Sequence, residues 1–194
     1  TGDSVKLVRN ENYWGEPAYC KEVIFRYIPE ASQRTIELET GGIDINLDVG
    51  FDDVEYFMTD DYKVGYYETH AVPGVFFNMS DVRNSPVRDI NLRKAIAYAI
   101  DSKLIVDRFY NGVYTVANSN ISPYYGVLYN AEGKEPLYAY DLDKAKAYMK
   151  DSGVPQGTKL TMLIDENPEN KGMAEIIQDM VAAIGIEMEI LTRN

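Results

Sequence analysis

The chain has 194 residues, of which 45% are hydrophobic and 26% are charged, a composition typical of a globular protein. Its formal net charge of -12 argues against nucleic-acid binding, which needs an excess of Lys and Arg to displace counterions. A single cysteine and a single histidine exclude an internal disulfide and a zinc cluster of Cys and His ligands.

The first half of the chain mixes predicted strands with short helices. Residues 1–3 form a predicted turn with no strand before it, so we expect the chain to be an excised piece of a longer protein. Ser32 is the expected N-cap of a two-turn helix that ends at Gly41 and Gly42. Alternation and β-branched residues predict strands at 4–9, 22–28, 43–47, 62–68 and 74–79, and a short helix opened by acids at 52–58.

The second half is predominantly helical after a polar linker at 80–86. Asp89 is the expected N-cap of one helix, Asp101 or Ser102 caps the next, and Asp141 caps a third. Residues 158–165, the helix from Pro168 to Ile184, and residues 186–191 form a predicted βαβ unit with parallel strands and a right-handed crossover.

Residues 113–138 lack a clear period, and we interpret them as a long loop rich in tyrosine. Loops of this length are uncommon and often functional. The tyrosines in it are not readily explained as core residues, because a loop has no core of its own to fill. Tyrosine side chains suit pockets and interfaces, since they offer a flat apolar area with a polar tip. The tyrosines are Tyr114, Tyr124, Tyr125, Tyr129 and Tyr138.

The residues that could carry catalysis or metal binding have more ordinary interpretations. His70 is expected to be a surface residue at the end of a strand, and Cys20 a semi-buried small hydrophobe. No phosphate-cradling glycine motif is present. Four aspartates lie close together in the sequence: Asp52, Asp53, Asp60 and Asp61. They lack the spacing of a calcium-binding loop and are expected to form a solvated helix face.

A series of motifs along nearly the whole chain resembles the family 5 solute-binding proteins of bacterial ABC importers, the oligopeptide, dipeptide and nickel-binding group. The series is LVRNENYWG (7–15), EVIFRYIPEASQRTIELETGGIDI (22–45), VFFN (75–78), RDINLRKAIAYAIDSKLIV (88–106), ISP (121–123), YDLDKAKAYMKDSGVPQG (140–157) and IIQDMVAAIGIEMEI (176–190). Ser102 departs from the basic residue that members often carry there. Val72-Pro73-Gly74 replaces aromatic residues of many peptide-binding members.

The resemblance implies part of an α/β, periplasmic-binding-protein-like (type II) two-lobe fold, with mixed sheets flanked by helices. Residues 1–80 would be the later part of the first lobe and 81–194 the beginning of the second. The hinge would lie near 79–86, with Asn78, Ser80 and Pro86 as hinge residues. Family members are more than twice this length, and the acidic residue that pairs with a peptide amino group lies in a part with no counterpart here.

The implied function is to bind a peptide or similar small solute between the lobes for ABC permease subunits, with no cofactor, no enzymatic step and no nucleic acid. The protein would be extracellular or periplasmic, and it would meet the membrane only through a lipid anchor outside this segment. Nickel-chelate or sugar binding, and a sensor or interaction module built on the same lobe, remain alternatives. The candidate ligand-binding residues, each of which could instead be a turn or packing residue, are Val72, Pro73, Gly74, Val75, Asn118, Ser122, Tyr124 and Tyr125.

Overall fold

The computed structural model describes residues 2–67, 69–80, 85–129 and 137–193. The chain divides into two compact units, Thr1–Val64 and Gly65–Asn194, which are described separately below. Within the described ranges, no helix combines the length and the apolar character that a membrane crossing requires.

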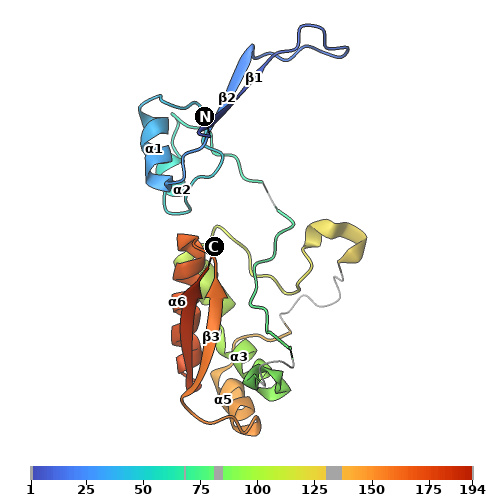
Figure 1. Cartoon of the computed structure of the whole chain (residues 1–194), viewed down its shortest axis with the longest axis vertical. Helices are drawn as coiled ribbons and strands as arrows, with labels where there is room; N and C mark the ends of the chain where they lie inside the picture. The colour runs from blue at the N-terminus through green and yellow to red at the C-terminus, as the bar shows by residue number, and fades with distance from the viewer. Residues whose placement is uncertain (1, 68, 81–84, 130–136, 194) are drawn as a thin grey trace. The chain divides into compact units, whose positions relative to one another are not determined.

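The first unit contains a two-stranded antiparallel sheet and two helices (Figure 1). Opposite residues of an antiparallel pair share a face of the sheet, and Val5 with Phe25 and Leu7 with Val23 give it one apolar face. All residues of both strands are exposed, so no other part of the described unit covers this face. The elements are β1 (Ser4–Val8), β2 (Glu22–Arg26), α1 (Ala31–Glu39) and α2 (Val54–Phe57).

Arg34 of α1 fastens the helix to the chain on both sides of it. Its guanidinium donates hydrogen bonds to the carbonyl oxygens of Ile28 at 2.8 Å, Pro29 at 2.7 Å and Asp48 at 3.1 Å. A guanidinium is always charged and carries several donors in a fixed fork, so one side chain satisfies several backbone acceptors. The irregular chain around residue 48 is thereby held against α1.

The second unit begins with extended chain and then becomes mostly helical. Its elements are η2 (Pro86–Arg88), α3 (Ile90–Ala99), α4 (Ser102–Leu104), the π-helical turn η3 (Ile105–Phe109), η4 (Pro123–Leu128), α5 (Leu142–Asp151), β3 (Thr158–Ile164), α6 (Pro168–Ala182) and β4 (Ile186–Thr192).

The predicted βαβ unit is confirmed as parallel pairing of β3 with β4, and α6 packs on the sheet that they form (Figure 1). The helix buries Ala174, Ile177 and Val181, which recur at the three- and four-residue spacing of one helix face. Ile186 at the start of β4 is 1% exposed. This packing gives the carboxyl-terminal part of the chain its own core.

Helices α3 and α5 form the other packed pair of this unit. Leu92 and Ala95 of α3 and Ala145 of α5 have no exposed area, and the small alanines allow the helices to approach closely. The Asp89 carboxylate accepts hydrogen bonds from the backbone N–H groups of Asn91 and Leu92, which confirms it as the N-cap of α3. The caps by Asp101 and Asp141 are confirmed in the same way.

Several predicted elements are wrong. Residues 43–47, the described part of 62–68, and 74–79 form no strand, because extended chain becomes a strand only when a partner supplies the ladder hydrogen bonds. Ser32 does not cap α1, which begins at Ala31 without a side-chain cap. The helix expected at 52–58 is the single turn α2.

Two further predictions need qualification. Cys20 is exposed and not semi-buried, because the loop between β1 and β2 has no core beneath it. The expected linker ends at Pro86, the first residue of the 3-10 turn η2, and the expected tyrosine-rich loop contains the 3-10 segment η4. Residues 68, 81–84 and 130–136, which belong to the predicted strand, linker and loop, lie outside the described residues.

Candidate functional site

Two segments that are far apart in the sequence meet in the second unit, around a cluster of five residues: Thr69, His70, Ser122, Tyr124 and Tyr125. We call these residues the His70 cluster. The Ser122 hydroxyl donates to the carbonyl oxygen of Thr69 at 3.4 Å and accepts from the backbone N–H of Tyr124 at 3.3 Å. This one side chain therefore caps η4 and joins the loop to the earlier segment.

The aromatic side chains of the His70 cluster pack edge to face. The His70 ring centroid lies 4.8 Å from that of Tyr125 and 6.1 Å from that of Tyr124, with an interplanar angle of 70° in both pairs. Such edge contacts match the ring quadrupoles and are favourable. Both tyrosines are 48% exposed, whereas Ser122 is 3% exposed. The cluster therefore has a buried polar joint and an accessible aromatic surface.

The rest of the loop is fixed by contacts on both sides of Ser122. The Tyr129 hydroxyl donates to Asn118 Oδ1 at 3.0 Å, which ties the two ends of the turn together. Earlier in the chain, Tyr110 packs edge to face on Tyr114 at 4.6 Å and is 7% exposed. Burial, with the nearby Glu169 carboxylate, raises the pKa of the Tyr110 hydroxyl above its ordinary range.

The structure therefore brings together three of the predicted ligand-binding residues, Ser122, Tyr124 and Tyr125, with Asn118 bonded to the same loop. The remaining four, Val72, Pro73, Gly74 and Val75, begin two residues after His70, in chain that forms no helix or strand. Within the described residues, none of these four has a hydrogen bond to the loop. Space is open beside Gly74, where no atom lies within 4 Å of the position that a Cβ would take.

Thr69 and His70 belong to the cluster but were not among the predicted ligand-binding residues. His70 is exposed, as expected, but its contact with two tyrosines was not predicted. No local pattern joins it to the loop. Ser122-Pro123, a cap followed by proline, is a helix-start signal that could have identified the loop turn.

The predicted hinge residues occupy the chain on each side of the undescribed residues 81–84. Asn78 Oδ1 accepts a hydrogen bond from the backbone N–H of Ser80 at 3.0 Å, a local turn contact. Pro86 opens η2. The position of the hinge stays a prediction.

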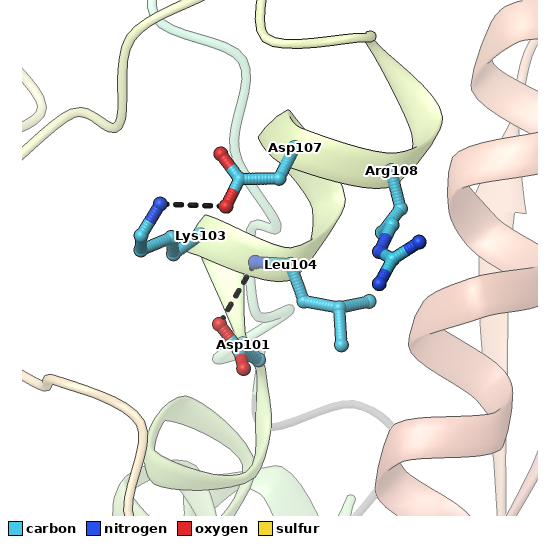
Figure 2. A pocket seen from close by; sticks show the side chains of 5 residues that line it. All are labelled: Asp101, Lys103, Leu104, Asp107 and Arg108. Atoms are coloured by element: carbon cyan, nitrogen blue, oxygen red, sulfur yellow. Dashed lines mark hydrogen bonds and ion pairs between the residues drawn. The ribbon is translucent and has the colours of Figure 1, made fainter.

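Two hollows on helix surfaces lie apart from all of these residues. One has a volume of about 260 Å³ and is lined by α4 and η3, where Lys103 Nζ lies 2.6 Å from Asp107 Oδ2 (Figure 2). Both side chains are largely exposed, and exposed ion pairs of this kind contribute little energy. The other hollow, of about 450 Å³, lies between α5 and the end of α6. Neither contains a predicted site residue.

Metal binding has no support in the described part of the chain, where no group of three or more His, Cys, Asp or Glu side chains could hold an ion. His70 has tyrosine neighbours, and the Ser122 hydroxyl is bonded to backbone groups. The cluster can offer a ligand the exposed rings of Tyr124 and Tyr125, whereas the Ser122 hydroxyl is used within the cluster.

Comparison with known proteins shows one family. Residues 1–194 match the sequence profile described as bacterial extracellular solute-binding proteins, family 5 Middle. The chain is 29% identical over 197 residues to heme-binding protein A of Haemophilus influenzae, and the alignment covers 99% of this chain and 35% of that protein. It is also 29% identical over 200 residues to the nickel-binding periplasmic protein of Escherichia coli K12, and this alignment covers 95% of this chain and 38% of that protein.

A solved structure gives the same result for the fold. The ABC transporter-associated periplasmic binding protein DppA from Helicobacter pylori, in complex with the peptide STSA, is 28% identical and has a TM-score of 0.74. The similarity covers 99% of this chain and 36% of that one. The expected α/β fold of periplasmic binding proteins is thereby confirmed. The chain spans little more than a third of the length of these relatives.

Proposed function

We propose, from the premise that this chain belongs to family 5 of the bacterial extracellular solute-binding proteins, that the complete protein binds a peptide or similar small solute. The solute would lie between two lobes, and closure of the lobes would present it to the permease of an ABC importer. The observation that carries the proposal is the His70 cluster, where an accessible aromatic surface is built on a buried polar joint.

Contact chemistry supports a peptide ligand in particular. A peptide carries backbone donors and acceptors along its length and apolar side chains between them. The open backbone around Gly74 can supply hydrogen bonds, and the rings of Tyr124 and Tyr125 can receive an apolar side chain. A solved relative is a complex with the peptide STSA. The proposed function includes no catalytic step.

Heme is the second candidate ligand, and one observation favours it. Heme-binding protein A is the name of a relative 29% identical to this chain. His70 and Tyr125 lie side by side, and both histidine and tyrosine are side chains that ligate heme iron. A nickel complex is suggested by the name of another relative, but in the described part of this chain no group of three or more His, Cys, Asp or Glu side chains could ligate the metal directly.

Calorimetric titration of the complete protein separates these ligands. The tetrapeptide Ser-Thr-Ser-Ala, a random tetrapeptide pool, heme and a nickel–histidine complex would be tested in parallel, with visible absorption recorded for heme. We expect peptide binding, weakened about fivefold in Tyr125→Ala because a favourable aromatic contact contributes about 1 kcal/mol. Tyr19→Ala is the matched control, since Tyr19 is fully exposed in the first unit. Heme binding that His70→Ala abolishes, without any peptide binding, would instead establish the second candidate.

We also propose an extracellular or periplasmic location with a lipid anchor outside this segment. The family is described as extracellular, and one relative is named as periplasmic. Labelling of the complete protein with radioactive palmitate, together with protease treatment of intact cells and of spheroplasts, tests both statements. An unlabelled protein that protease reaches only after the cytoplasmic membrane is broken would contradict them.

A further inference from the structure

Three aromatic side chains fasten the start of the tyrosine-rich loop to α6 within the second unit. Tyr110 directly follows the π-helical turn η3 and is 7% exposed. Its hydroxyl donates a hydrogen bond to the sulfur of Met173 on α6 at 3.7 Å. Its ring meets that of Phe109 edge to face at 4.9 Å and that of Tyr114 at 4.6 Å. We call Phe109, Tyr110 and Tyr114 the aromatic clamp.

Helix α6 has room for the clamp because Gly172 carries no side chain. A Cβ at Gly172 would lie 2.7 Å from Cε2 of Phe109, so a side chain there would displace the ring. The backbone N–H of Tyr110 bonds to the carbonyl oxygen of Ile105, five residues earlier, at 3.3 Å. Such π-helical turns are rare and are frequently found at functional sites. The turn ends with Phe109 and Tyr110 both in contact with α6.

The chain leaves the clamp through a tight turn that Tyr110 also helps to fix. Asn111 has a φ of +49°, in the left-handed region that few residues other than glycine adopt. The backbone N–H of Val113 bonds to the carbonyl oxygen of Tyr110 at 2.9 Å. The direction in which the loop starts is therefore set by the residue whose ring lies in the clamp.

The clamp is close enough in the sequence to affect the His70 cluster. Asn118 follows Tyr114 by four residues, which span at most about 14 Å, and the bond of Asn118 to Tyr129 closes the turn that carries the cluster. On its other side the loop is joined to Thr69 by the Ser122 hydroxyl. A single neutral hydrogen bond contributes little net stability, so the placement of the loop depends on the clamp as well.

We propose that Tyr110 is a positioning residue for peptide binding, whose ring anchors the loop on α6 and thereby holds Tyr124 and Tyr125 where a peptide meets them. This inference rests on the proposed function. Because Tyr110 is 7% exposed, it acts through the loop and not by touching the peptide. Without its ring the loop samples more positions, and a smaller fraction of the protein is competent to bind.

Hydrogen exchange of two amides in the complete, ligand-free protein tests the anchoring. The Val113 amide bonds to the carbonyl of Tyr110, and the Tyr125 amide bonds to that of Ser122 at 3.0 Å. In Tyr110→Leu we expect both amides to exchange at least about threefold faster, because the edge contacts of the ring are lost. Acceleration at Val113 alone would overturn the proposal, since the effect would then not reach the His70 cluster.

Titration with the tetrapeptide pool tests the link to binding. Affinity should fall about fivefold in Tyr110→Leu and stay within about twofold of the parent in Tyr110→Phe, which keeps the ring. Equal losses in these two variants would overturn the role of the ring. The matched control is Ile177→Val, a 4% exposed position on α6 outside the clamp, which should lower the urea midpoint but leave affinity and both amides unchanged. A fivefold loss of affinity in this control would also overturn the proposal, because loss of stability alone would then explain the effect.

A second variant covers the case in which Tyr110→Leu does not fold. Tyr114 is 51% exposed, so Tyr114→Leu removes one ring of the clamp with little loss of core packing. The same faster exchange at Val113 and Tyr125 is expected there, and parental rates at both amides would overturn the proposal. Failure of the proposed function is seen separately, as a parent protein that binds no peptide of the pool while exchange at both amides still responds to the clamp variants.

Discussion

The Ser122 hydroxyl is a single group on which the geometry of the His70 cluster depends. Replacing Ser122 by alanine removes the acceptor for the backbone N–H of Tyr124 and the donor to the carbonyl of Thr69. The loss of a capping acceptor costs about 1 kcal/mol, and the loss of a neutral hydrogen bond costs about 1 kcal/mol more. Because Ser122 is 3% exposed, water cannot readily take the place of the hydroxyl.

Hydrogen exchange of the Tyr124 amide reports the first of these bonds directly. In Ser122→Ala we expect this amide to exchange at least about fivefold faster, which corresponds to about 1 kcal/mol of lost protection. Peptide affinity should fall by about tenfold as the loop leaves Thr69. Ser122→Thr keeps the hydroxyl and should retain most of the protection. An unchanged exchange rate and affinity in Ser122→Ala would refute the assignment of Ser122 as the joint.

Two further predictions concern the stability of the second unit, one through two glycines and one through the cap of α5. Gly185 has a φ of +83°, and a Cβ there would lie 1.5 Å from Gln156 Oε1. Gly185→Ala should therefore lower the free energy of unfolding, measured with urea, by about 2 kcal/mol. Gly153→Ala, with a φ of +65° and open space, should cost about half as much, and equal costs would show that the Gln156 contact is unimportant. The backbone N–H of Lys144 lowers the pKa of the Asp141 carboxylate, so the stabilisation from this cap is present above about pH 4 and is lost as pH falls through the lower folded pKa. Asp141→Asn keeps a cap but should show a smaller fall in urea midpoint between pH 5 and pH 3; an equal fall would contradict the role of Asp141.

The helices of the second unit could be predicted because their signals are local. Asp89 and Asp141 bond to backbone groups within three residues, and apolar residues recur on one face of α6. The pairing of β3 with β4 follows from the helix between them. The strand predictions at 43–47 and 74–79 failed because alternation specifies extended chain but does not supply a partner strand.

The candidate site could be predicted only in part for the same reason. The dense tyrosines and the missing period identified the loop, since both are properties of a short stretch of sequence; the Ser122-Pro123 helix-start signal within it was not used. The contact of this loop with His70 depends on how two distant segments pack, and no spacing in the sequence encodes that contact. The burial of Cys20 was predicted wrongly for a similar reason: the residue is exposed because no core lies beneath its loop, and the residues around it do not show this.

Peptide binding at the His70 cluster is tested most directly by hydrogen exchange across the complete protein, with and without the tightest-binding peptide from the tetrapeptide pool. Peptide should slow exchange in residues 69–75 and 118–129, the two segments that carry the His70 cluster. Protection confined to other segments, with these two unchanged at saturating peptide, would contradict it.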